Sequence, residues 1–194
     1  MTFNLQQLPN LLTLLRIVLI PVFVVVFFLP FDNARLVATV ILFIAGVTDW
    51  LDGFLARRFE LHSPLGAFLD PVADKLMVST ALVAIAIADP QLVIGVSVMV
   101  IIGREITISA LREWMAEVGA RATVAVSMIG KFKTAAQMLA LGFLVYRDDL
   151  WGIPVYTFGV TLLLISVVLT LWSMIVYLRA AWPSLAADEY DDEA

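Results

Sequence analysis

The sequence contains no cysteine and only one histidine, His62. Disulfide bonds and thiolate chemistry are therefore excluded, and a zinc site loses most of its usual ligands. Any metal site in this chain has to be built mainly from carboxylate oxygens. Such ligands favour Mg²⁺, Mn²⁺ or Ca²⁺ over softer ions.

Charged residues are also scarce, at 15 % of 194 residues, while hydrophobic residues make up 62 % and the mean hydropathy is +0.98. Soluble domains contain about a quarter charged and roughly half apolar residues. The composition is therefore typical of an integral membrane protein. At roughly 20 residues per spanning helix, the chain has room for six spans and for no second soluble domain.

Six apolar segments are expected to cross the membrane, which predicts an all-α, polytopic membrane protein. The breaks between them contain proline, glycine or charge, where helices end or leave the membrane. Residues 1–183 are predicted to form one membrane domain, and the acidic residues 184–194 a disordered tail. The predicted spans are residues 9–29, 34–57, 66–88, 92–117, 126–146 and 153–179.

The basic residues predict the orientation of these spans. Threading the chain alternately puts ten of the twelve lysines and arginines at helix ends on the side of the N-terminus, with only Arg35 and Arg147 opposite. By the positive-inside rule, the N-terminal side is cytoplasmic. The expected location is a bacterial inner membrane, with the aspartate-bearing side facing the cytoplasm.

Four aspartates interrupt the second and third apolar segments. On the second segment, two of them lie about 60° apart and share a helical face with two small residues. On the third, the other two lie one turn apart and follow a glycine. The two carboxylate pairs are thus predicted to face each other across a short turn. The residues are Asp49, Asp52, Gly53 and Ala56, followed by Gly66, Asp70 and Asp74.

Four carboxylates at membrane level need neutralisation, because a charge at the centre of a spanning helix costs on the order of 2.5–3.5 kcal/mol. Divalent cations would satisfy both the charge and the spacing, and two ions about 4 Å apart can stabilise the attacking and leaving oxygens at phosphorus. The small residues would leave space for a ligand. The alternative is pairing with nearby basic residues at the interface, namely Arg57, Arg58 and Lys75.

Residues 49–74 read D-x₂-D-G-x₂-A-R-x₈-G-x₃-D-x₃-D, which resembles the full signature of the CDP-alcohol phosphotransferase family. The resemblance implies a six-helix membrane enzyme, typically a homodimer, that displaces CMP from a CDP-linked donor with an alcohol. It further implies that the four aspartates bind two divalent ions, Mg²⁺ or Mn²⁺, and that Asp74 is also the catalytic base. The residues implied to border the donor's cytidine diphosphate are Gly53, Ala56, Arg57 and Gly66.

Two later segments, residues 103–117 and 130–138, indicate which alcohol is used. They contain arginines and lysines, and arginine forks suit a phosphate. A phosphorylated polyol is therefore favoured over inositol, choline or ethanolamine. The alternatives are Arg–Glu clusters at the interface and ordinary positive-inside lysines. The predicted acceptor-phosphate residues are Arg104, Arg112, Lys131 and Lys133.

Longer motifs, among them REITISALREWMAE and GKFKTAAQM, resemble bacterial members of this family that use CDP-diacylglycerol and sn-glycerol 3-phosphate. The implied products are phosphatidylglycerophosphate and CMP. The resemblance also places Pro9, Asn10, Thr13 and Arg16 beside the active site. The alternative is that these residues serve as a helix entry and an interfacial arginine. Another acceptor, such as inositol phosphate or serine, stays open, and so does a divalent-cation or proton-coupled transporter. Membrane lipid is an expected partner and nucleic acid is not.

Overall fold

The structure, a computed structural model, describes residues 8–59, 64–117 and 128–191. Within these ranges, side chains are described except at residues 8–9, 56–57, 59, 64–65, 67, 128–131 and 183–191. The described chain forms six α-helices and no strand beyond one isolated bridge. The helices are α1 (Leu8–Phe28), α2 (Ala34–Phe59), α3 (Pro64–Ala88), α4 (Leu92–Glu117), α5 (Met128–Tyr146) and α6 (Val155–Asp191). The predicted all-α class is confirmed.

Five of the helices, all except α5, contain segments long and apolar enough to cross a membrane. Their boundaries follow the predicted spans closely, because charged, proline and glycine residues end the apolar runs. The apolar part of α5 that the structure describes, Phe132–Tyr146, is shorter than a full span. The chain is thus a multi-pass membrane protein, and the crossing by α5 stays a prediction.

Helix α6 is longer than the sequence indicated. Its predicted span ends at residue 179, whereas the helix continues to Asp191. Residues 184–191 are therefore helical where a disordered tail was expected. The segment contains two alanines and one leucine, which have high helix propensity. The division of the chain at residue 183 stays a prediction.

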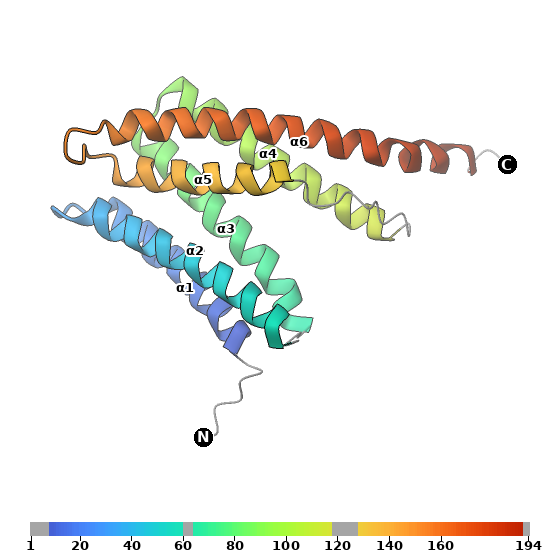
Figure 1. The fold of residues 1–194 in the computed structure, drawn as a ribbon, viewed down its shortest axis with the longest axis horizontal. Coiled ribbons are helices and arrows are strands. Elements are labelled where there is room, and N and C mark those ends of the chain that lie inside the picture. The colour runs from blue at the N-terminus through green and yellow to red at the C-terminus, as the bar shows by residue number, and fades with distance from the viewer. Residues whose placement is uncertain (1–7, 60–63, 118–127, 192–194) are drawn as a thin grey trace, which may run out of the picture. The chain divides into compact units, whose positions relative to one another are not determined.

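The chain divides into two compact units, Met1–Pro90 with Leu141–Gly159, and Gln91–Ala140 with Val160–Ala194. In the first unit, α1 packs against both α2 and α3, whereas α2 and α3 contact each other much less. Figure 1 shows these three helices in blue, cyan and green. Helix α1 therefore connects the two helices that carry the aspartates.

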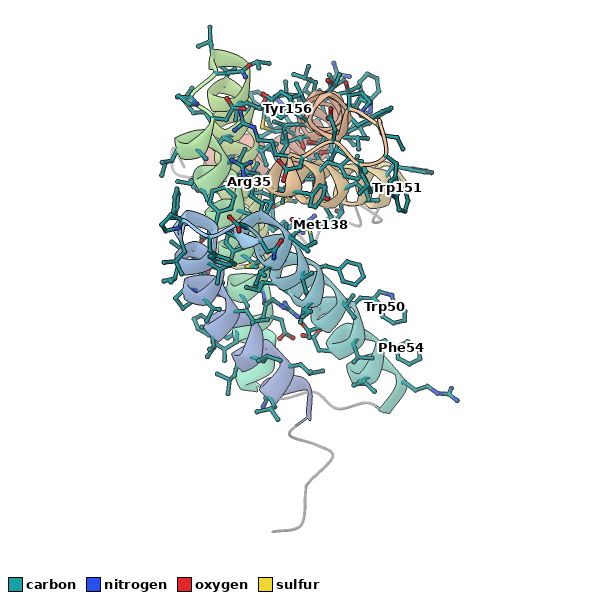
Figure 2. All side chains as sticks on the ribbon, turned by 90° about the vertical axis from the view of Figure 1, so that its left-hand side faces the viewer. Arg35, Trp50, Phe54, Met138, Trp151 and Tyr156 are labelled. Carbon is teal, nitrogen blue, oxygen red and sulfur yellow. The ribbon has the colours of Figure 1, made fainter. Side chains whose placement is uncertain are left out.

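A tight turn joins α5 to α6. Leu150 and Ile153 exchange two backbone hydrogen bonds, of 3.2 and 2.9 Å, and Trp151 and Gly152 between them have φ angles of 51° and 81°. Positive φ at both central residues is the requirement of a type I′ turn, which glycine meets easily and tryptophan rarely. The turn returns the chain along α5, and the side chain of Trp151 projects from it (Figure 2).

Candidate active site

Asp49 and Asp52 of α2 both bind Arg16 of α1. Arg16 Nη1 lies 2.7 Å from Asp49 Oδ1, and Arg16 Nη2 donates a hydrogen bond to Asp52 Oδ2. One guanidinium reaches both carboxylates because residues three apart share a helical face. Asp49 and Asp52 therefore lie on one face of α2, as their spacing in the sequence predicted.

The pair formed by Arg16 and Asp52 is buried. The exposed fraction of the side chain is 1 % for Arg16 and 5 % for Asp52, against 46 % for Asp49. Buried ion pairs need additional hydrogen bonds to offset the loss of water. However, Arg16 Nε has no hydrogen-bond partner in the part of the chain that the structure describes. A positive charge with incomplete pairing thus lies beside the two carboxylates.

Asp70 of α3 also binds α1. The hydroxyl of Thr13 donates a hydrogen bond to Asp70 Oδ1. Thr13 and Arg16 are three residues apart, so one face of α1 contacts acids from both neighbouring helices. Asp74, one turn after Asp70, is exposed. Helix α1 therefore contacts one member of the Asp70/Asp74 pair and both members of the Asp49/Asp52 pair. The direct facing of the two carboxylate pairs stays a prediction.

Helix α2 has two distinct faces at this level. Asp49 and Asp52 face α1, whereas the rings of Trp50 and Phe54 stack with their centroids 5.8 Å apart. Both rings are exposed and point away from α1 and α3 (Figure 2). The acids thus face a protein neighbour while the aromatic side chains are available to lipid, as is usual for charged residues in spanning helices.

The donor set suits a hard divalent cation, since carboxylate oxygens are the ligands that Mg²⁺ and Mn²⁺ prefer. The binding of Arg16 shows that these carboxylates attract positive charge. In the present arrangement, no three acidic side chains among the residues described come close enough to hold an ion. Arg16 and Thr13 contact the same carboxylates instead. The metal-binding role of the four aspartates stays a prediction.

The residues predicted to border the donor nucleotide lie along the same two helices. Gly53 follows Asp52 on α2, and Gly66 is buried near the start of α3. The side chains of Ala56 and Arg57 lie outside the described residues. The role of these four residues in donor binding stays a prediction.

A second charged cluster lies in the second unit and contains residues predicted to bind the acceptor's phosphate. Arg104 Nη1 donates a 2.9 Å hydrogen bond to Glu105 Oε1, and Lys133 Nζ donates to the same oxygen. Both cationic side chains are buried. Cations from α4 and α5 therefore converge on one carboxylate, as they would have to converge on the phosphate of an acceptor.

Helix α6 supports both predicted arginines with residues that the sequence analysis did not single out. Arg104 Nη2 donates to Ser173 Oγ at 2.9 Å, and Arg112 Nη2 donates to Tyr177 Oη at 2.6 Å. The ring of Tyr177 also lies 6.0 Å from Arg104 Cζ and 4.8 Å from Arg112 Cζ. Two polar residues four apart on an apolar helix are a signal that could have identified this pair.

Arg104 Nε is buried and lacks a hydrogen-bond partner among the described residues. The ion pair of Arg104 with Glu105 agrees with the alternative of an Arg–Glu cluster. The unsatisfied Nε favours a ligand, because a buried N–H without a partner costs about 1–3 kcal/mol. Lys131 has its side chain outside the described residues. The acceptor-binding role of the four cations stays a prediction.

Comparison with known proteins identifies relatives over nearly the whole chain. The family model for CDP-alcohol phosphatidyltransferase matches residues 6–172. A curated protein of Salmonella typhimurium, named CDP-diacylglycerol–glycerol-3-phosphate 3-phosphatidyltransferase, is 52 % identical over 93 % of this chain and 96 % of its own length. A protein of the same name from Haemophilus influenzae is 51 % identical over 95 % of this chain and 97 % of its own length.

Proposed function

Since the chain belongs to the CDP-alcohol phosphatidyltransferase family, we propose that it transfers the phosphatidyl group of CDP-diacylglycerol to sn-glycerol 3-phosphate. The products are phosphatidylglycerophosphate and CMP, so the protein is a transferase of phospholipid biosynthesis. The observation that carries this conclusion is the 52 % identity, over 93 % of the chain, to proteins named for this reaction. The names of these relatives agree with the reaction expected from the longer motifs, which the aspartate signature alone did not specify.

In the proposed reaction, the primary hydroxyl oxygen of sn-glycerol 3-phosphate forms a bond to the β-phosphorus of the donor. The bond from this phosphorus to the CMP oxygen breaks, and CMP leaves with the electron pair. Asp74 takes the proton of the attacking hydroxyl, and its exposed position on α3 supports this assignment. Divalent ions bound by Asp49, Asp52, Asp70 and Asp74 would supply charge that neutralises the pyrophosphate.

Arg104, Arg112 and Lys133, together with Lys131, are proposed to hold the phosphate of the acceptor. The support is the convergence of Arg104 and Lys133 on Glu105. A phosphate could take the place of the Glu105 carboxylate, because both are anions that accept several hydrogen bonds from cationic donors. Acceptors without a phosphate could not compete in this way, which is the proposed origin of the selectivity.

The protein is proposed to lie in the inner membrane of a bacterial cell, with its active site facing the cytoplasm. The asymmetric distribution of basic residues supports this orientation. A homodimer is proposed from the family resemblance. Gly53, Ala56, Arg57 and Gly66 are proposed to border the cytidine diphosphate, since they flank the aspartates in the signature.

The proposal is tested by CMP release from CDP-diacylglycerol by the purified protein in detergent micelles. Parallel reactions receive sn-glycerol 3-phosphate, glycerol, inositol phosphate or serine, each with Mg²⁺, with Mn²⁺ or with EDTA. We expect release with sn-glycerol 3-phosphate only, loss in EDTA and recovery with either ion. Faster release with serine or inositol phosphate would contradict the proposed acceptor.

The metal assignment is tested with the variant Asp52→Asn, which keeps the shape of the side chain and removes its charge. We expect turnover to fall to well below a tenth of the wild-type value, which corresponds to a loss of more than about 1.4 kcal/mol. Turnover above that level at saturating Mg²⁺, or release that EDTA does not reduce, would contradict the metal assignment.

A further inference from the structure

Arg16 is the only charged residue of α1, and its side chain is almost completely buried. A lone arginine within a spanning helix costs several kcal/mol unless it is paired, and such residues usually have a functional role. The proposed reaction assigns the aspartates but gives Arg16 no part. Its two partners, Asp49 and Asp52, are both proposed metal ligands, which suggests that its role concerns the metal site.

We propose that Arg16 is a built-in counter-ion that holds Asp49 and Asp52 in place before a divalent cation binds and that lowers the affinity of the site for the cation. The inference rests on the proposed metal-dependent function. Arg16 acts through the two aspartates and not on the substrate, so it is a positioning residue.

The contacts allow Arg16 and a cation to bind the same carboxylates. Arg16 uses Oδ1 of Asp49 and Oδ2 of Asp52, and a carboxylate has two oxygens with about four acceptor sites. The second oxygen of each aspartate is therefore outside the contact with Arg16. Because Arg16 and the cation carry charges of the same sign, their repulsion at a few ångströms weakens cation binding.

The pairing of Arg16 is also incomplete. Nε and Nη1 are buried and make no hydrogen bond with any of the residues described, although Nη1 lies 2.7 Å from a carboxylate oxygen of Asp49. A buried arginine with a purely structural role is expected to have its N–H groups satisfied. The arrangement instead fits a group that neutralises the carboxylates and leaves them able to bind another ligand.

The test compares wild type with Arg16→Gln, which removes the charge, in detergent micelles without substrate. Thermal unfolding is measured in EDTA and in saturating Mn²⁺, and Mn²⁺ affinity is measured from the free-ion electron paramagnetic resonance signal. In EDTA the midpoint for Arg16→Gln should fall by about 5 °C or more, because two repelling carboxylates lose their counter-ion. Saturating Mn²⁺ should recover more than half of this loss.

The Mn²⁺ affinity of Arg16→Gln should rise about threefold to thirtyfold, since a fixed positive charge is removed from the site. The double variant Arg16→Gln/Asp52→Asn should be more stable in EDTA than Arg16→Gln alone, because the buried carboxylate that lost its partner is also removed. Arg16→Lys, which keeps the charge, should retain the wild-type Mn²⁺ affinity to within about twofold.

The matched control is Arg147→Gln. Arg147 pairs with Asp89, also in the first unit, with 3.8 Å between Nη2 and Oδ2. Replacement of Arg147 should change the thermal stability equally with and without Mn²⁺ and leave the Mn²⁺ affinity unchanged. The inference is wrong if Arg16→Gln behaves like this control or binds Mn²⁺ more weakly. A wild type that binds no Mn²⁺ would refute both the metal site and this inference, whereas CMP release would still test the reaction independently.

Discussion

Tyr177 forms an exposed contact with Arg112, one of the residues proposed to bind the acceptor. Arg112 Nη2 donates to the hydroxyl of Tyr177, and the guanidinium lies over the ring at 4.8 Å from its centroid. Stacking on an aromatic face restricts the rotation of an arginine while leaving some of its N–H groups available. A restricted arginine is well suited to bind a phosphate, because less conformational entropy is lost on binding.

We therefore predict that Arg112→Ala raises the KM for sn-glycerol 3-phosphate and leaves the KM for CDP-diacylglycerol nearly unchanged. The expected loss is about 1.5–3 kcal/mol, the range for hydrogen bonds to charged groups, or roughly tenfold to a hundredfold in KM. Arg112→Lys should recover only part of it, since a point charge cannot reproduce a fork. Equal effects on both substrates, with reduced thermal stability, would instead indicate a structural role.

Helices α1 and α6 play similar parts in the fold, since each contacts and orients charged side chains on neighbouring helices. Helix α1 contributes Thr13 and Arg16 to aspartates of the first unit, and α6 contributes Ser173 and Tyr177 to arginines of the second. All four supporting residues lie on helices that are otherwise strongly apolar. Such second partners fix the direction of a charged side chain, which a binding site requires.

Helix α6 approaches α5 closely at Gly159, and this packing leads to a prediction about stability. A Cβ atom at the buried Gly159 would lie 2.9 Å from Leu144 Cγ and 3.2 Å from its backbone nitrogen. We expect Gly159→Ala to lower stability by about 1–3 kcal/mol, because overpacking forces the two helices apart. Thermal unfolding in micelles measures this effect.

Gly142→Ala on α5 is the control for this substitution, since a Cβ there meets nothing within 4 Å. Its unfolding midpoint should stay the same or rise slightly, because alanine has the higher helix propensity. A similar loss of stability at both positions would mean that helix packing at Gly159 is not the cause.

At the scale of the whole molecule, charge is distributed unequally between the two predicted membrane sides. Arg147 is one of two basic residues predicted to lie opposite the active site, and it approaches Asp89 to 3.8 Å. Tyr156 donates a 2.6 Å hydrogen bond to the same carboxylate oxygen, and its ring lies 5.3 Å from Arg147 Cζ. Arg147 thus has two partners on this side of the membrane. The predicted orientation depends on the small number of basic residues here, two of twelve, and not on this pairing, because acidic residues contribute little to the positive-inside rule.

This orientation can be tested directly because the chain has no cysteine of its own. We expect Trp151→Cys, at the fully accessible α5–α6 turn, to react with a membrane-impermeant maleimide on intact spheroplasts. Glu117→Cys, at the end of α4, should react only after permeabilisation. The reverse pattern would place the active site on the outer face. Reaction of both from the same side would show that α5 does not cross the membrane.

The sequence alone determined the membrane class, most helix boundaries and the spacing of the four aspartates. These properties are local, because hydropathy acts over a single span and helical geometry fixes which residues share a face within one or two turns. The shared face of Asp49 and Asp52 was predictable for this reason. The end of α6 was predicted less well, because the acidic composition indicated disorder where the helix continues to Asp191.

Only the tertiary structure decided which residues support these groups. Arg16 is 36 positions from Asp52, and Ser173 and Tyr177 are 69 and 65 positions from the arginines that they contact. No helical period connects residues so far apart, and the packing of α1 against both α2 and α3 depends on how whole helices fit together. The partners of a buried charge are chosen by this packing, since an ion pair in a membrane forms with whichever polar group the neighbouring helix brings within reach.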